Sequence, residues 1–144
     1  MKLFECAIRY NKTLDNGLQK KITEYYLVDA LSFTEAETRI TDRMQDFTGG
    51  EFEVVAEKIT RYSEYLPAAA AGEDRVYKAR INLIALDERS GREKKTPLYM
   101  AVWASGVDNA HGKIVRHFSG TVIDYEIASI DETPVMDVFL YQPA

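Results

Sequence analysis

The chain has 144 residues, of which 46% are hydrophobic and 28% are charged, as is usual for one folded domain and unusual for a disordered segment. Its formal net charge of −5 argues against a protein that coats nucleic acid non-specifically, because such binding needs a strong basic excess. One cysteine, Cys6, excludes an intramolecular disulfide framework and a multi-cysteine zinc site. An acid already stands at Glu5, so we expect no secretory signal.

The predicted elements begin with a strand at residues 4–10, where apolar side chains alternate with more polar ones. Asn16-Gly17 then predicts a tight hairpin turn, since this turn needs positive φ at its central residues. Residues 21–26 (K-I-T-E-Y-Y) open a second strand, and residues 52–55 form a third after an intervening helix. The first half of the chain therefore predicts the order β-β-α-β.

The helix is indicated by apolar residues that recur at spacings of three and four. Thr34 and Glu37 predict a capping box at its start, and Gly49-Gly50 predicts its end. Its apolar face consists of Phe33, Ala36, Ile40, Met44 and Phe47.

The second half of the chain repeats this order after a shift of about 73 residues. Residues 77–83 align with the first strand, Ser90-Gly91 with the turn, and residues 94–99 with K-x-T-x-x-Y. Residues 125–128 align with the third strand. The second helix carries Val107, Ala110, Ile114 and Phe118 on its apolar face, with Asp108 as its expected N-cap and Gly120 as its end.

These patterns predict an α+β fold of internally duplicated β-β-α-β units, with a mostly antiparallel sheet covered by two helices. We expect a single domain, residues 1–144, made of two pseudo-repeats at about 1–66 and 75–144. An exposed connector at 67–74 joins them. Residues 135–141 predict one more strand, which pairs within the domain or with a neighbouring chain.

Catalytic and cofactor motifs are missing from the sequence. It has no phosphate-binding G-x-x-x-x-G-K, no dinucleotide fingerprint and no G-x-S-x-G. Cys6 shares a strand face with apolar residues and is expected to be a small buried hydrophobe. Glu51, Glu53 and Glu57 would suit a cation if they shared one strand face, but a solvated face is the simpler interpretation. We therefore expect no enzyme, no cofactor and no metal site.

Positive charge gathers beside both predicted hairpin turns, with tyrosines close by in the sequence. Cations beside aromatic rings suit a phosphate and a stacked base. Lysine-rich hairpins also serve solubility and protect sheet edges, which is the competing interpretation. The candidate ligand-binding residues are Lys12, Lys20, Lys21, Tyr26, Arg92, Lys94, Lys95 and Tyr99.

Five segments carry a family resemblance: F-E-C-x-I-R-Y at 4–10, Y-L-V-D-A-L-S-F-T-E-A-E at 26–37, G-E-F at 50–52, E-K-K-T at 93–96 and D-Y-E-I-A-S at 124–129. Together they resemble an uncharacterised family, a domain of unknown function found in Bacteroides-type bacteria and in their phages and mobile elements. The resemblance covers nearly the whole chain. It implies a small accessory protein of phage or mobile DNA, and it implies no activity.

We therefore expect a non-catalytic accessory binding protein of a phage or mobile element. Its specific role would be to sequester a phosphate-bearing small ligand, such as a nucleotide signal, and so counter host defence. One alternative is a nucleic-acid-binding accessory protein, which the net charge does not favour. The other is a protein–protein inhibitor of a host protein or a virion-associated module. We expect a homo-oligomer without membrane contact in the cytoplasm, that of the host if a phage encodes it.

Overall fold

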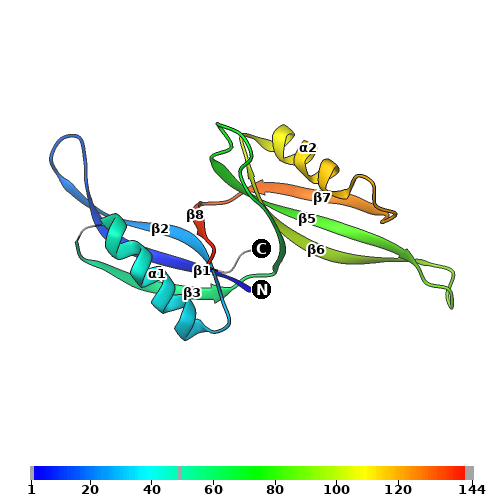
Figure 1. The fold of residues 1–144 in the computed structure, drawn as a ribbon, viewed down its shortest axis with the longest axis horizontal. Coiled ribbons are helices and arrows are strands. Elements are labelled where there is room, and N and C mark those ends of the chain that lie inside the picture. Colours follow the sequence, from blue (N-terminus) through cyan, green and yellow to red (C-terminus); the bar gives the residue numbers. More distant parts are fainter. Residues whose placement is uncertain (1, 49, 142–144) are drawn as a thin grey trace. The chain divides into compact units, whose positions relative to one another are not determined.

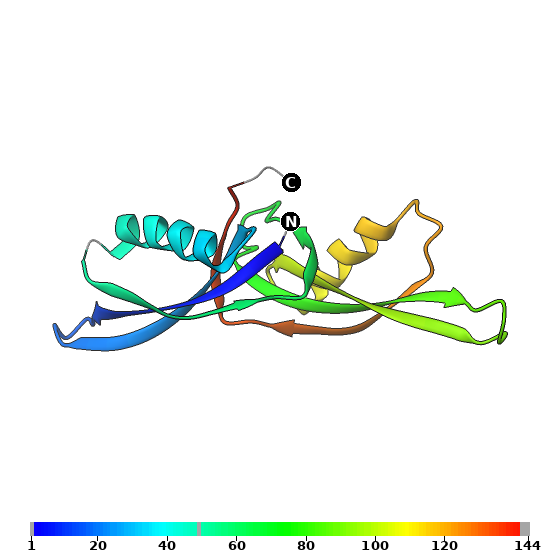
Figure 2. The same cartoon turned by 90° about the horizontal axis from the view of Figure 1, so that it is seen from below.

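The computed structural model describes residues 2–48 and 50–141, which form two compact units. Unit 1 comprises the described residues of Met1–Arg61 and Pro134–Ala144, and unit 2 comprises Tyr62–Thr133. Each unit has a four-stranded mixed sheet with one helix on one face (Figures 1 and 2). The predicted α+β class is confirmed, with two sheets that carry one helix each.

Unit 1 consists of strands β1 (Lys2–Thr13), β2 (Gln19–Ala30), β3 (Phe52–Ile59) and β8 (Val135–Phe139), and helix α1 (Phe33–Thr48). Its strand order is β3-β1-β2-β8. β1 is antiparallel to both of its neighbours, whereas β8 runs parallel to β2. The predicted hairpin joins β1 to β2, and Gly17 has the positive φ of 80° that this turn requires.

Unit 2 has the same arrangement, with strand order β4-β6-β5-β7. Its elements are β4 (Tyr62–Leu66), β5 (Arg75–Leu86), β6 (Glu93–Ala104), α2 (Val107–Phe118) and β7 (Tyr125–Glu132). β4 pairs in parallel with β6, and the other two pairs are antiparallel. The sequence did not predict β4, because it is short and has no clear alternation of apolar and polar residues.

Each helix packs its apolar face on its own sheet. In α1 the predicted residues Ala36, Ile40 and Met44 are fully buried, while Phe33 and Phe47 are 51% and 63% exposed. The core of unit 1 also contains Phe4, Cys6, Ile8, Tyr26, Val28, Ala30 and Phe139. The core of unit 2 consists of Tyr77, Ala79, Ile81, Met100, Val102, Ala104, Ala110, Ile114 and Phe118.

The capping box of α1 lies two residues before the predicted one. Ser32 Oγ accepts a hydrogen bond from the backbone N–H of Glu35 at 3.1 Å, and Glu35 Oε1 accepts one from the N–H of Leu31 at 3.0 Å. The pair is therefore Ser32 and Glu35, because the helix begins at Phe33 and places Thr34 within its first turn.

The N-cap of α2 is Gly106, so the predicted cap Asp108 lies within the first helical turn. Asn109 Oδ1 accepts a hydrogen bond from the N–H of Ser105 at 2.9 Å. At the C-terminal ends, α1 stops at Thr48, and the predicted Gly49 lies outside the described residues. α2 stops at Phe118, close to the predicted Gly120.

The last strand of each predicted repeat pairs with the other repeat. β4 follows β3 in the chain yet pairs with β6, and β8 follows β7 yet pairs with β2. The two junctions have the same register: Tyr25 pairs with Val135, Tyr62 pairs with Tyr99, and a register shift follows at once in both. The compact units therefore divide the chain differently from the predicted repeats. Whether their shared topology arose by duplication stays a prediction.

The short linker between β3 and β4 explains why β4 pairs with a strand of the other repeat. Only Thr60 and Arg61 separate β3 from β4. The Cα atoms of the last residue of β3 and the first residue of β4 can therefore lie at most about 11 Å apart, the length of three Cα–Cα steps. To reach the far side of β2 in its own repeat, β4 would have to cross three strand spacings, about 14 Å. The fourth strand must therefore come from elsewhere in the chain.

The predicted connector is exposed at residues 67–72, but Glu73 is only 9% exposed. Its carboxylate forms an ion pair with Lys113 of α2 at 2.8 Å. The connector is thus attached to the fold by a buried charge, which corrects the prediction at this residue. None of the helices in the described part of the chain is long and apolar enough to cross a membrane.

Candidate functional site

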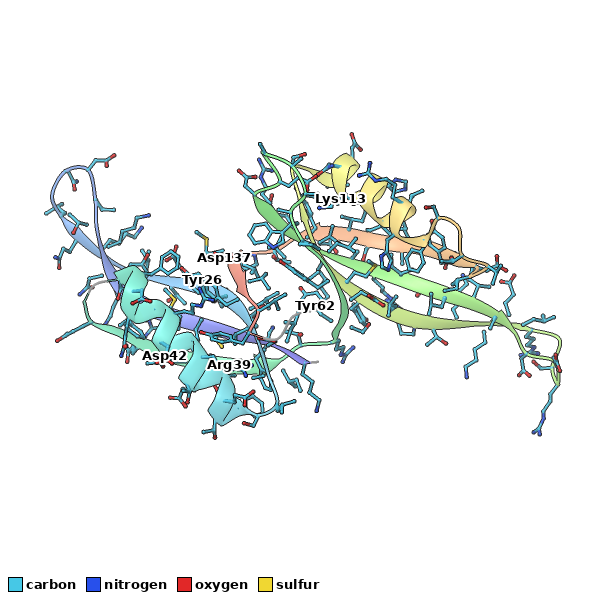
Figure 3. The ribbon with its side chains drawn as sticks, in the orientation of Figure 1. Tyr26, Arg39, Asp42, Tyr62, Lys113 and Asp137 are labelled. Carbon is cyan, nitrogen blue, oxygen red and sulfur yellow. The ribbon has the colours of Figure 1, made fainter. Side chains whose placement is uncertain are left out.

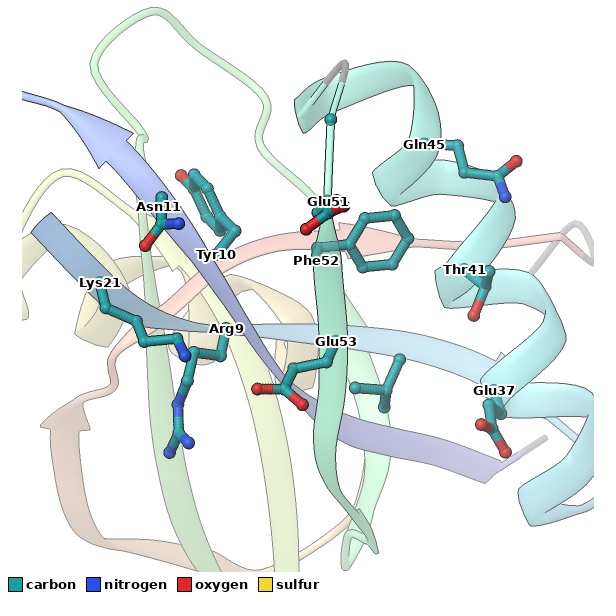
Figure 4. Close-up of a pocket in the computed structure, with 12 residues that line it drawn as sticks. Arg9, Tyr10, Asn11, Lys21, Glu37, Thr41, Gln45, Glu51, Phe52 and Glu53 are labelled. Atoms are coloured by element: carbon teal, nitrogen blue, oxygen red, sulfur yellow. The ribbon is translucent and has the colours of Figure 1, made fainter. Parts of the chain in front are cut away.

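A hollow of about 690 Å³ lies at the free edge of β3 in unit 1 (Figure 4). A neighbouring hollow of about 310 Å³ shares Glu37 and Val54 with it. We call the two together the α1–β3 groove; it is bordered by residues 50–57, by one side of α1, by residues 9–11 of β1 and by Lys21. The larger volume falls in the range of small-molecule sites.

One side of the groove is cationic. Arg9 lies opposite Glu53 in the sheet and Lys21 lies opposite Asn11, on the face directed away from α1. Figure 4 shows Arg9, Lys21 and Glu53 on the same side of β3. Within residues 2–48 and 50–141, no salt bridge engages Arg9 or Lys21. Both cations are therefore available to an anion.

The other side of the groove is formed by α1. Glu37, Thr41 and Gln45 follow one another at intervals of four residues, so they form a row along the helix. The ring of Phe52 points toward this row (Figure 4). This side offers acceptors, donors and an apolar ring surface.

Glu57 lies on the α1 side because β3 contains a bulge. The register shifts between Ala7 and Ile8, which sets Glu57 opposite the core residue Cys6. Glu51, Glu53 and Glu57 therefore do not share one strand face, the condition set for a cation site, since the bulge separates Glu53 from Glu57.

The carboxyl group of Glu57 is poorly satisfied. Burial, and secondarily the charge of Glu37, raises the pKa of Glu57. Its Oε1 atom is buried, and among the described residues it has no hydrogen-bond partner. A buried polar oxygen of this kind in a hollow is a candidate contact for a ligand.

The equivalent position in unit 2 is apolar. The pairs Cys6–Glu57 and Ala79–Ile130 occupy the same place in the two sheets, each the second pair before the register shift. Ile130 packs against the core of unit 2. Unit 1 thus carries a carboxylate where unit 2 completes its core. The shift of 73 residues aligns Glu57 with Ile130, so this signal was present in the sequence and was missed.

The predicted site residues of unit 1 lie in different places. Lys12 and Lys20 are direct cross-strand partners beyond the groove, and Lys21 lines it. Tyr26 (Figure 3) is only 5% exposed, and its ring stacks on Phe139 with centroids 5.5 Å apart. Its ring therefore faces the core and is not open to a ligand.

The remaining predicted residues belong to unit 2. Arg92 and Lys94 are exposed beside the turn, and Lys95 forms an ion pair with Glu126 at 2.9 Å. Tyr99 is half-buried, with Lys78 Nζ 5.2 Å from its ring centroid. The groove residues that sequence reasoning missed include Arg9, Glu37, Thr41 and Gln45.

Cys6 is fully buried, as predicted. Burial, followed by the nearby carboxylates, raises its pKa to about 12, so the sulfur is a thiol at neutral pH. In the part of the chain that the structure describes, no group of three or more His, Cys, Asp and Glu side chains is arranged to hold a metal ion.

Comparison with known proteins identifies the family. The family described as Domain of unknown function (DUF4494) matches residues 2–141. The chain therefore belongs to this family. No curated protein and no solved structure matches the chain.

Proposed function

We propose that this member of the DUF4494 family is a non-catalytic binding protein that holds a phosphate-bearing small ligand, such as a nucleotide, in the α1–β3 groove. One observation carries the proposal: Arg9 and Lys21, which have no salt-bridge partner among the described residues, border a hollow of about 690 Å³. Its opposite side presents hydrogen-bonding side chains and an aromatic ring. Cations bind the phosphate of a nucleotide, and hydrogen-bonding side chains and aromatic rings bind its base.

Charge limits the ligand that fits. Three carboxylates, Glu37, Glu51 and Glu53, line the same hollow as the two cations. A triphosphate would bring more negative charge than two cations offset, and the carboxylates would repel it. We therefore expect a nucleoside monophosphate to bind more tightly than the corresponding triphosphate.

Arg9 supports a phosphate contact through its planar group, which forms two parallel hydrogen bonds to phosphate oxygens. Lys21 of β2 adds a point charge on the same sheet face as Arg9. The row of Glu37, Thr41 and Gln45 would then contact the sugar hydroxyls and the base.

Native mass spectrometry of the full chain with ribose 5-phosphate, nucleoside monophosphates and nucleoside triphosphates tests the proposal and also reports the oligomeric state. We expect one monophosphate bound per chain, with weaker retention of the triphosphates. Titration calorimetry should give affinities that fall as salt concentration rises, because the contact is electrostatic. If none of these probes binds at millimolar concentration, the proposal is wrong.

Arg9→Ala and Lys21→Ala should each weaken monophosphate binding by about 10-fold, the effect of one charge-assisted hydrogen bond. Lys20→Ala is the matched control: it removes a neighbouring lysine of the same strand that does not line the groove. Equal losses in all three variants would point to general charge attraction and would contradict a groove site.

The biological setting forms part of the proposal. Holding a ligand without turning it over suits sequestration of a nucleotide signal. The resemblance to proteins of Bacteroides-type bacteria, their phages and mobile elements supports a role in countering host defence. We expect such a protein to act in the cytoplasm as a homo-oligomer.

A further inference from the structure

The smaller hollow of the groove contains a carboxyl pair beside an exposed aromatic ring. It is lined by Glu37 and Glu57 together with Phe33, whose ring is 51% exposed. The Phe33 ring packs on Phe4 in a T-shaped arrangement, with centroids 5.0 Å apart. Much of its surface stays open to stack on a planar ligand.

Glu57 Oε1 lacks a partner among the described residues, so the protein leaves a buried oxygen unsatisfied at this point. Glu37 of α1 lines the same hollow and gives no compensation, since burial and secondarily the charge of Glu37 raise the pKa of Glu57. A ligand that supplies N–H donors in this hollow would satisfy the Glu57 carboxyl group. Ile130 at the equivalent position of unit 2 shows that the fold itself needs no carboxyl group there.

On the basis of the proposed function, we infer that this hollow selects a nucleobase that presents two adjacent N–H donors, as guanine does. The two oxygens of a carboxylate match the neighbouring ring N–H and exocyclic amino group of guanine. Adenine presents a donor beside an acceptor on the corresponding edge, which leaves one carboxylate oxygen against a lone pair. The base stacks on Phe33 and donates to Glu57 on the α1 side of β3, and the phosphate reaches Arg9 and Lys21 around the free edge of that strand.

Calorimetry on the full chain with GMP, IMP, AMP and ribose 5-phosphate tests the inference. Hypoxanthine in IMP keeps the ring N–H of guanine but lacks its amino group. We expect GMP to bind at least about 10-fold more tightly than AMP, the effect of one hydrogen bond to a charged group. IMP should fall between the two.

Two variants assign the preference to its residue. Glu57→Gln and Glu57→Ile should bring GMP affinity down to that of AMP and leave ribose 5-phosphate binding unchanged. The Ile variant copies the residue of unit 2, so its side chain is one that this fold packs. Glu88→Gln, at an exposed turn of unit 2, is the control and should keep the preference.

The outcomes separate the two proposals. If ribose 5-phosphate binds but GMP and AMP bind equally, or if the Glu57 variants keep the GMP preference, the selection of guanine is wrong and the phosphate site stands. If ribose 5-phosphate and all nucleotides fail to bind, the proposed function is wrong and the inference falls with it.

Discussion

Lys113 Nζ lies 2.8 Å from Glu73 Oε1, and these side chains are only 8% and 7% exposed. Lys113 projects from α2 (Figure 3) and also donates hydrogen bonds to the carbonyl oxygens of Pro67, at 2.8 Å, and Trp103. Glu73 Oε1 in turn accepts the N–H of Ala69 at 2.7 Å. One ammonium group thus joins the connector, α2 and β6 of unit 2.

Replacing Lys113 should destabilise unit 2. Lys113→Met keeps the length and apolar stem of the side chain but leaves Glu73 buried without its cation. We expect the melting temperature to fall by roughly 5 °C or more in differential scanning calorimetry. Lys78→Met, at an exposed lysine of β5, is the control and should change it little. A Lys113→Met protein that melts like the wild type would show that the pair contributes nothing to stability.

The same pair predicts a pH dependence. Hydrogen bonds from Lys113 and Ala69 lower the pKa of Glu73 from 4.5 to about 2. Because the folded pKa lies below the unfolded one, the stabilisation is complete above about pH 4.5 and is lost as pH falls toward 2. Urea midpoints measured from pH 6 to pH 2.5 should fall more steeply for the wild type than for Glu73→Gln. Parallel curves would contradict this assignment.

Because β8 follows β7 in the chain but pairs with β2, we expect a residue of β8 to stabilise unit 1. Phe139 of β8 is 5% exposed, belongs to the core of unit 1 and stacks on Tyr26 of β2. Phe139→Ala should cost about 3 kcal/mol. Hydrogen exchange should accelerate at the amides of β1 and β2, and less at those of β5 and β6. Met136→Ala, at the exposed residue that the register shift skips, is the control. Unchanged protection in β2 would show that β8 does not support unit 1.

The helix cores give a direct test of the fold. Ile40 and Ile114 are fully buried at equivalent places in α1 and α2. Ile40→Asp or Ile114→Asp buries a charge without a partner, and either should destabilise its unit by more than about 4 kcal/mol. Val115→Asp, beside Ile114 but 41% exposed, should stay folded by circular dichroism. A cooperative, wild-type melting curve for either buried variant would mean that the core is wrongly assigned.

The features that the sequence predicted are those that depend on neighbouring residues. Asn16-Gly17 indicated the first hairpin because its turn conformation is set by two adjacent residues, and Gly17 has the required positive φ. The buried stripes of α1 and α2 followed from helical spacing in the same way. Errors at the caps were small, since Ser32 and Thr34 are both good N-cap residues and only packing distinguishes them.

The groove and the strand exchange were decided by the tertiary structure. Pairing of β8 with β2 joins residues more than a hundred positions apart, and no local pattern specifies such a partner. A single unpaired residue in β3 places Glu57 against the helix, because side chains alternate between faces and one extra residue reverses the alternation. Neighbouring residues therefore determined the helices, strands and turns of this protein. The position of Glu57 in the candidate site depends on the register between β1 and β3, which is defined only when these distant strands pair.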